Sequence, residues 1–240
     1  MRDDFFLQAS SSEGNEPYPR LAVLAFTRQE LKIIRSLKGG GREMKPLLGG
    51  MTSVTFWPDL VLAGPMIGAP QAAMVMEILF RRGVSSFISL GWCGSLQERL
   101  RWGDIVLPDA ALSEEGTSAH YPLADGQARP DEELKSRLAS ALESLGGRYT
   151  AGPVWTTDAP YRETKAVIQK HAAAGLLAVD METSALMTVA RFRRLVWAGL
   201  LVVSDELWGP SWRPGFESDE LTAGLTAAAQ AIMKLHQHGA

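Results

Sequence analysis

The sequence predicts a single α/β domain with three layers, in which helices flank a central mixed β-sheet. Short apolar runs that suit buried strands alternate along the chain with segments whose apolar residues recur at helical spacing. Two neighbouring pairs of strand-like runs, near residues 53–63 and 104–112, predict some antiparallel pairing. No internal repeat, low-complexity tract or change of composition divides the chain, so one domain over residues 20–240 is expected.

The expected strands are short apolar runs bounded by turn residues. The first run, residues 21–26, is apolar throughout and suits a buried strand. Pro58 and Asp59 separate two further runs and predict a hairpin turn between them. The run that starts at residue 85 is expected to enter a glycine-flanked loop made of Gly91, Trp92, Cys93 and Gly94. The expected strands are residues 21–26, 53–57, 60–64, 85–90, 103–112, 149–155, 175–180 and 196–205.

The expected helices follow from apolar spacing and from residues that stop a helix. Three glycines at 39–41 end the first helix, and Gly83 ends the second. In the C-terminal segment, Leu221, Leu225 and Ile232 fall on one helical face. The expected helices cover residues 28–38, 69–82, 131–145, 161–173 and 181–192, and a C-terminal helix contains residues 221–235.

Composition and charge favour an ordinary globular protein. The 240 residues are 46% hydrophobic, and 24 Lys and Arg against 27 Asp and Glu give a formal net charge of −3. This balance gives no reason to expect nucleic acid or a membrane surface as a partner. Cys93 is the single cysteine, which excludes an intrachain disulfide. Residues 1–19 form a polar lead-in without the apolar core of a signal peptide, and no long apolar run is present, so a cytoplasmic protein is expected.

Polar residues follow three of the expected strands. They are the segment 91–95, the pair Asp180 and Glu182, and the pair Ser204 and Asp205. In open α/β sheets, ligands bind beyond the carboxyl ends of strands. Glu182 and Asp205 are separated by one helix and one strand, which is the length that brings two neighbouring strand ends together. These three sites are therefore expected to share one pocket.

Several motifs that follow one another along the chain give it a family resemblance. The segment 64–121, which contains "GPMIGAP", "SLGWCGSL" and "EEGTSAHY", resembles the nucleoside phosphorylase/nucleosidase superfamily, as do "TTDAPYRET", "VDMETSAL" and "LLVVSD" further along the chain. The likeness covers about residues 20–235 and keeps the order of the motifs. It implies an enzyme that breaks the N-glycosidic bond of a nucleoside, with a phosphorylase/hydrolase-like fold. The superfamily includes purine and uridine phosphorylases and several nucleosidases.

The resemblance assigns the contacts to the ribose to one strand end and the proton donor to another. Glu182 would accept hydrogen bonds from the 2′- and 3′-hydroxyls, and Met181 would pack against the sugar. Such a carboxylate interacts more strongly as positive charge develops on the ribose, which lowers the barrier. Asp205 would be the general acid that protonates the leaving base. Ser204 would lie at the base and orient Asp205. Asp180 is expected to be structural, as a helix cap. The alternative for Glu182 and Asp205 is a cap or a surface turn.

The resemblance leaves hydrolysis and phosphorolysis open and favours hydrolysis. The phosphorylases place Ser or Thr after the first glycine of the loop, where this chain has Trp92, a poor phosphate ligand. They also carry two arginines where this chain has Ser89 and Glu30. Glu30 matches the position at which nucleosidases carry a carboxylate that activates water. Its alternative role is an exposed acid in the first turn of a helix. Arginines that could still supply a positive charge are Arg28, Arg99, Arg101, Arg162 and Arg213.

Further contacts are implied by the same motifs. Tyr161 would stack on the base and Arg162 would contact it or a substituent, with a purine-like base favoured. Packing at a helix start is the alternative for Tyr161. His120 is a candidate for the 5′ end of the sugar, although a lone histidine is more often structural. The segment 208–216 is expected to be either a lid or a packed surface loop.

The expected partners are a small-molecule substrate and further copies of the same chain. The resemblance implies a nucleoside substrate, a homo-oligomer (a dimer or a trimer of dimers), and no cofactor, with inorganic phosphate as co-substrate if the enzyme is a phosphorylase. No cluster of side chains has metal-ligand spacing, so no metal is expected. A non-catalytic nucleoside sensor is the alternative from another class. Dinucleotide binding through "GPMIGAP" is disfavoured because the glycine spacing is wrong.

Overall fold

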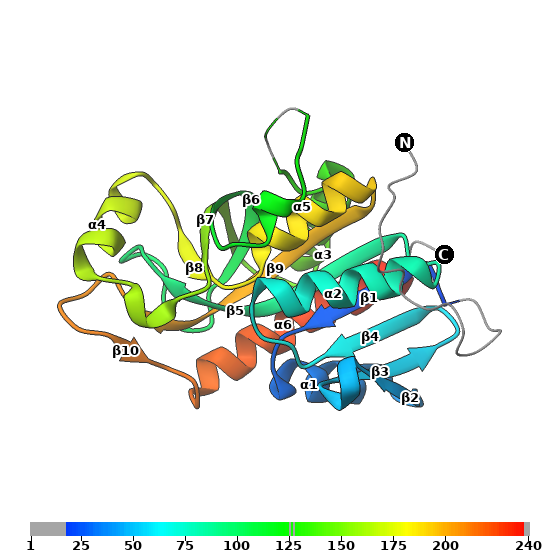
Figure 1. The fold of residues 1–240 in the computed structure, drawn as a ribbon. Coiled ribbons are helices and arrows are strands. Elements are labelled where there is room, and N and C mark those ends of the chain that lie inside the picture. The colour runs from blue at the N-terminus through cyan, green and yellow to red at the C-terminus, as the bar shows by residue number, and fades with distance from the viewer. Residues whose placement is uncertain (1–17, 125, 127, 238–240) are drawn as a thin grey trace.

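The computed structural model describes residues 18–124, 126 and 128–237. The polar lead-in expected over residues 1–19 lies almost wholly outside the described residues. The described chain forms a mixed β-sheet of ten strands with helices packed on it, so the predicted fold class is confirmed (Figure 1). No helix within this part of the chain has the length and apolar character needed to span a membrane.

The elements follow the predicted order closely. The strands are β1 Leu21–Ala25, β2 Arg42–Leu47, β3 Thr52–Trp57, β4 Leu60–Gly64, β5 Ser86–Ser95, β6 Ile105–Glu114, β7 Tyr149–Thr157, β8 Ala178–Asp180, β9 Val196–Glu206 and β10 Arg213–Pro214. The helices are α1 Arg28–Lys38, α2 Gly68–Arg81, α3 Glu132–Ser144, α4 Lys165–Ala173, α5 Thr183–Arg193 and α6 Asp219–Gln237. Three 3₁₀ turns are η1 Leu48–Gly50, η2 Ser118–His120 and η3 Pro160–Arg162.

The sheet has a parallel centre and antiparallel additions. Strands β4, β1, β5 and β9 are neighbours that run parallel, and β3 and β2 extend the β4 edge as antiparallel strands. Beyond β9 the order is β6, β7 and β8, and β8 pairs back with the end of β5. Since β9 also pairs with β5, a closed ring of paired strands is formed by β5, β9, β6, β7 and β8. The hairpin at Pro58 is confirmed by the antiparallel pairing of β3 with β4. The strand pair expected near residues 104–112 is wrong, because residues 105–114 form one long strand.

Helices cover both faces of the sheet. Val23 and Ala25 of β1 belong to the core on one face, where α1, α3 and α6 pack. Ala22 and Leu24 point to the other face, where α2 and α5 pack. This burial on both sides explains why β1 reads as a continuous apolar run. In Figure 1, α4 lies apart from these layers, beside β8.

The register of β5 brings two of the predicted strand ends together. Gly94 of β5 pairs with Val179 of β8 on one side and with Asp205 of β9 on the other. Residues 91–94 were expected to form a loop, and this prediction is wrong. They continue strand β5 to Ser95 because β9 pairs with them along one side and β8 pairs with Gly94 and Ser95 on the other. The segment that follows β8 and the end of β9 therefore lie on either side of one strand.

Candidate active site

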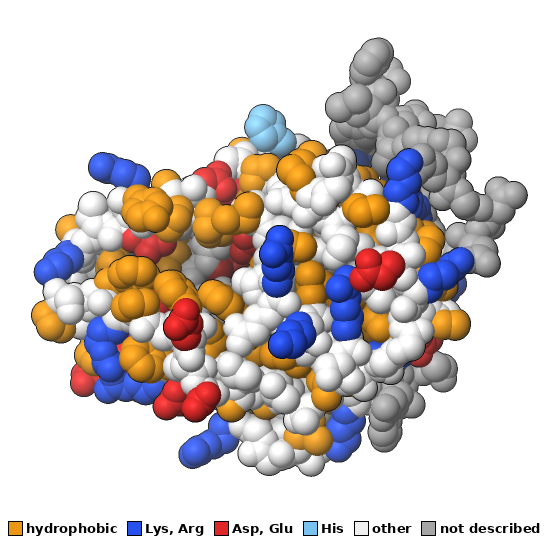
Figure 2. Space-filling model, turned by 90° about the horizontal axis from the view of Figure 1, so that it is seen from below, with side chains coloured by type: hydrophobic (Ala, Val, Ile, Leu, Met, Phe, Trp, Pro, Cys, Tyr) orange, Lys and Arg blue, Asp and Glu red, His pale blue; other side chains and the backbone are white. Residues whose placement is uncertain are grey.

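A cavity of about 600 Å³ lies at the carboxyl ends of β1, β5, β8 and β9. Segments 160–163 and 207–216 complete its wall. In the view of Figure 2, hydrophobic side chains surround a hollow in the left half of the molecule, and acidic side chains are visible there. Of the residues singled out in the sequence, Trp92, Cys93, Gly94, Tyr161, Met181, Glu182, Ser204 and Asp205 line this cavity.

Asp205 is half-buried at the end of β9, and both of its carboxylate oxygens accept hydrogen bonds. Ser204 Oγ donates to Oδ1 at 2.7 Å, and the indole Nε1 of Trp212 donates to Oδ2 at 2.8 Å. Gly94 leaves room for this carboxylate, because a Cβ there would lie 3.2 Å from Oδ2. The alternative of a surface turn is therefore wrong for Asp205, whose side chain faces the cavity.

Glu182 immediately precedes α5 and is buried. Its Oε1 accepts a hydrogen bond of 2.5 Å from the backbone N–H of Gly68, at the N-terminus of α2. Burial, together with the nearby charge of Asp180, raises the pKa of Glu182 to about 8 against the opposing effect of the bond from Gly68. The side chain makes no capping hydrogen bond to α5. The cap alternative is thus wrong for Glu182, which faces the cavity instead.

Asp180 takes the capping role that the sequence suggested. Its Oδ2 accepts from the backbone N–H of Thr183 at 2.8 Å, and its Oδ1 accepts from Thr156 Oγ1 at 2.6 Å. The first bond satisfies a free N–H in the first turn of α5. Asp180 also lines the cavity, which adds a second carboxylate beside Glu182.

Glu30 lies in the first turn of α1 with a relative exposure of 0%. Its Oε2 accepts from the backbone N–H of Thr27 at 3.1 Å and from Thr27 Oγ1, which completes a capping box. Its Oε1 is buried and has no hydrogen-bond partner among the described residues. Burial raises the pKa of Glu30 to about 7, against the hydrogen bonds from Thr27. The alternative of an exposed first-turn acid is therefore wrong, although Glu30 lies behind Thr27 rather than in the cavity lining.

The burial of Glu30 predicts that stability falls as the pH rises. Its carboxyl binds a proton more tightly in the folded state, so its contribution is complete below pH 4.5 and is lost as the pH passes 7. A rise from 4.5 to about 7 corresponds to about 3 kcal/mol. Urea unfolding should show that wild type loses about this much free energy of unfolding between pH 5 and pH 9, and that Glu30→Gln does not. Glu98→Gln on the surface is the control, and equal pH profiles for wild type and Glu30→Gln would contradict the prediction.

The cavity is acidic and lacks cations of its own. Four carboxyl groups line it, from Glu163, Asp180, Glu182 and Asp205, and none of the described residues in its wall is Lys or Arg. The arginines considered from the sequence lie elsewhere. Arg101 and Arg213 bind Glu206, and Arg28 faces a separate cavity near α1. Arg99 and Arg162 are also absent from the wall.

Two residues that were predicted to contact the substrate do not line the cavity. His120 is exposed at the end of η2, and Arg162 is exposed in η3, and neither lines the cavity. Tyr161 does lie at its rim and is fully exposed, at 101%, so packing at a helix start is wrong for this residue. Gly91 lies behind Phe26, whose ring fills the space that a Cβ would need.

Sequence reasoning missed Glu163, which lines the cavity beside Tyr161. Its carboxyl is half-buried and makes no hydrogen bond or ion pair with the described residues. Burial, together with the charge of Asp205, raises the pKa of Glu163 to about 7. Its proximity to Asp205 depends on how the 160–163 turn folds over β9, for which the sequence holds no signal.

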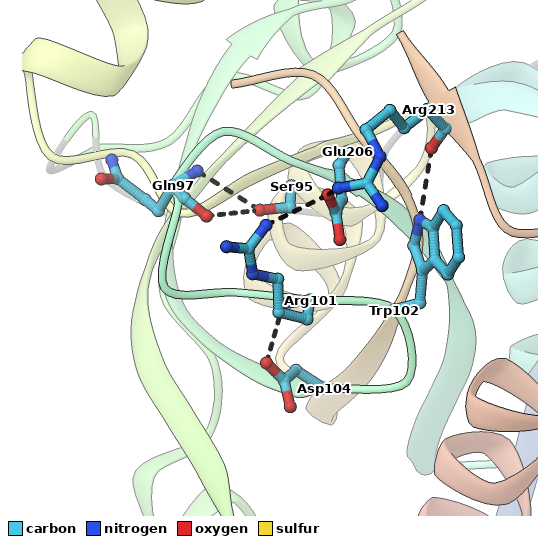
Figure 3. Close-up of polar contacts among 7 residues, drawn as sticks. All are labelled: Ser95, Gln97, Arg101, Trp102, Asp104, Glu206 and Arg213. Atoms are coloured by element: carbon cyan, nitrogen blue, oxygen red, sulfur yellow. Dashed lines mark hydrogen bonds and ion pairs between the residues drawn. The ribbon is translucent and has the colours of Figure 1, made fainter. Parts of the chain in front are cut away.

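The segment 207–216 covers one side of the cavity, and an acid on the far side of β9 holds it in place. Phe216 stacks on Trp92 with ring centroids 5.5 Å apart, and Trp212 lines the wall next to it. Figure 3 shows Arg101 and Arg213 converging on buried Glu206, at 3.3 Å and 2.6 Å. The segment is therefore packed, as one of the two alternatives expected, and it also contributes Trp212 and Phe216 to the cavity wall.

Among the described residues, no group of three or more His, Cys, Asp or Glu side chains is placed to hold a metal ion. Cys93 is buried, and burial together with the charges of Asp180 and Asp205 holds the pKa of its thiol well above the usual value. A thiol in that state is a poor nucleophile.

The fold and the acidic cavity at its strand ends define an α/β protein with a site for a small, neutral or cationic ligand. The model of the phosphorylase superfamily matches residues 20–235, and the chain belongs to this family. The expected class of enzyme, one that cleaves the N-glycosidic bond of a nucleoside, is thereby confirmed. Phosphorylases of this family take phosphate as co-substrate and need no cofactor.

Individual relatives include both reaction types. A guanosine phosphorylase of Halorubrum lacusprofundi is 33% identical over 163 residues, which cover 68% of each chain. A purine nucleoside phosphorylase from Toxoplasma gondii, solved in complex with immucillin-H, superposes with a TM-score of 0.82 at 18% identity, over 92% of this chain and 91% of that one. An AMP nucleosidase from Bacteroides thetaiotaomicron superposes with a TM-score of 0.72 at 25% identity, over 90% of both chains.

Proposed function

We propose that this protein hydrolyses the N-glycosidic bond of a purine nucleoside. The observation that carries the choice of hydrolysis is the acidic cavity wall, which has four carboxyl groups and no Lys or Arg. A phosphate dianion would have to be desolvated there without a positive partner, which is costly. Water meets no such barrier. Trp92 and Phe216 also stack where the phosphorylases have a small hydroxyl residue beside the anion.

The ribose is held at the β8 end of the cavity. Glu182 accepts hydrogen bonds from the two ribose hydroxyls, and Met181 packs against the sugar ring. Support comes from the position of both side chains in the wall and from the anchoring of Glu182 by the N–H of Gly68. As the C1′–N bond breaks, the ring becomes cationic, and nearby carboxylates stabilise it more than they stabilise the neutral substrate.

The departing base takes a proton from Asp205, which Ser204 orients through Oδ1. Glu30 accepts the proton of the attacking water through the hydroxyl of Thr27. In support of this role, Oε1 of Glu30 has no partner among the described residues, and its pKa of about 7 suits a general base at neutral pH. Thr27 lies between Glu30 and the cavity, where it can relay a hydrogen bond.

The base lies between the rim and β9. Tyr161 offers an aromatic face for stacking, and the unpartnered carboxyl of Glu163 can accept hydrogen bonds from N–H groups on the edge of a purine. The relative from Halorubrum, named as a guanosine phosphorylase, agrees with a purine. Ile67 and Tyr161 are exposed at the cavity mouth, which supports a homo-oligomer whose interface lies near the mouth.

A product assay tests the choice of hydrolysis. We expect free ribose from a purine nucleoside, at the same rate in buffer with and without inorganic phosphate. Ribose 1-phosphate as the product, formed at a rate that depends on phosphate, would contradict hydrolysis and support the phosphorolysis for which the Halorubrum relative is named. Binding without any cleavage would instead favour a nucleoside sensor.

A further inference from the structure

The exposed indole of Trp212 makes a hydrogen bond that the proposed chemistry has not yet used. Trp212 is 56% exposed, yet its Nε1 donates to Oδ2 of Asp205 at 2.8 Å. Ser204 Oγ occupies the other oxygen, Oδ1. Trp212 and Asp205 both line the cavity. Oδ2 is therefore the oxygen of Asp205 that the indole holds at the cavity wall.

The backbone around Trp212 is held firmly against β9. Strand β10 pairs Arg213 with Glu206 and Pro214 with Asp205, and the N–H of Gly215 donates to the carbonyl of Ser204 at 2.8 Å. On the opposite side of β9 from the cavity, Arg213 and Arg101 bind Glu206, and the indole of Trp102 donates to the carbonyl of Arg213 (Figure 3). These contacts fix the residue next to Trp212 and so aim its indole at Asp205.

We propose that Trp212 is a positioning residue for Asp205, an inference that rests on the proposed function. When the cavity is empty, the indole N–H holds Oδ2 in place. During cleavage, the proton leaves Oδ2 for the ring nitrogen of the base, which receives the electron pair of the C1′–N bond, while water supplies the new C1′–O bond. Asp205 thereby becomes a carboxylate, and the indole N–H stabilises the charge that forms on Oδ2.

Other ionisable groups around Asp205 offer no such stabilisation. Cys93 on β5 and Glu163 after η3 interact with its charge, and Asp180 and Glu182 stand in the same wall. None of these groups carries a positive charge at neutral pH. Among the described residues that reach its carboxylate, Ser204 and Trp212 supply the side-chain donors. Loss of the indole N–H should therefore disfavour the ionised form of Asp205.

The test compares Trp212→Phe with Trp208→Phe on two substrates. Trp208 lies in the same segment, and its indole Nε1 has no partner among the described residues, so its replacement makes a matched control. One substrate is a purine nucleoside, whose base needs a proton to leave. The other is 4-nitrophenyl riboside, whose nitrophenolate leaves without one. The kcat of each enzyme is measured on both substrates across pH.

Trp212→Phe should lower kcat on the nucleoside about tenfold, as expected for one hydrogen bond to a charged group, and leave the aryl riboside unaffected. The alkaline limb of kcat on the nucleoside should move to higher pH, and Trp208→Phe should match wild type throughout. Equal losses on both substrates, no loss, or an unmoved limb would overturn this inference. If wild type cleaves the nucleoside but not the aryl riboside, the position of the alkaline limb of kcat on the nucleoside decides whether Trp212 positions Asp205. Cleavage of neither substrate by wild type would overturn the proposed function itself.

Discussion

Asp205→Asn is expected to lower kcat for a purine nucleoside about a thousandfold while the nucleoside still binds. Asparagine has nearly the same shape and can still accept from Ser204 or Trp212, so the cavity should keep its form. It has no acidic proton to give to the base, and general acid catalysis contributes about a hundred- to ten-thousandfold. Steady-state kinetics gives kcat, and calorimetry gives the nucleoside dissociation constant of the variant.

The matched control for this variant is Asp109→Asn. Asp109 is a half-buried aspartate of β6 outside the cavity wall, so the same change there should leave kcat and binding as in wild type. Retention of more than about a tenth of the wild-type kcat by Asp205→Asn would show that another group supplies the proton. Glu163 would then be the first candidate, because it lines the same wall and interacts with the charge of Asp205.

Buried strands could be predicted from the sequence because their residues are apolar on both faces. β1 and β9 are examples, and their apolar runs leave little choice of structure. β2 was missed because "REMKPL" has charged residues and a proline, which an edge strand tolerates and a central strand does not. β10 has only two residues and exists through its pairing with β9, so no local pattern could indicate it.

The main acids of the site could be predicted because strand ends in such a sheet meet at one edge. Glu182 and Asp205 were placed in one pocket on that basis, and the pairing of Gly94 with both flanking strands is the physical reason. The burial of Glu30 and the approach of Glu163 could not be predicted in this way. Both depend on how segments distant in sequence pack, and charged side chains otherwise suggest exposure.

In the proposed mechanism, the acids gathered in the cavity would stabilise a cationic transition state. Glu182 is near Asp180 and Glu30, and burial with their charges raises its pKa to about 8. In the empty site near neutral pH, this carboxyl is therefore largely protonated. Ribose hydroxyls that donate to Glu182 favour its ionised form, and so does positive charge on the sugar. Binding of the ribose hydroxyls should thus be coupled to release of the proton from Glu182.

Glu182→Gln is accordingly expected to lower kcat/KM for a purine nucleoside by about a hundred- to a thousandfold. Two hydrogen bonds to a charged group, each worth about 1.5–3 kcal/mol, become weaker bonds to a neutral amide oxygen, so a part of their sum is lost. The same variant should lose little on the matching 2′,3′-dideoxynucleoside, which lacks both hydroxyls. The four values of kcat/KM form a double-mutant cycle whose coupling energy reports the interaction between Glu182 and the ribose directly.

The pH dependence of this coupling separates a ribose ligand from a structural acid. In wild type, the preference for the ribonucleoside over the dideoxynucleoside should grow as the pH rises through about 8, because Glu182 ionises there. Glutamine resembles the neutral carboxyl, so the preference of Glu182→Gln should stay flat. Glu98→Gln on the surface should behave as wild type. Equal losses on both substrates would mean that Glu182 acts only through its bond to Gly68, as a support for the start of α2.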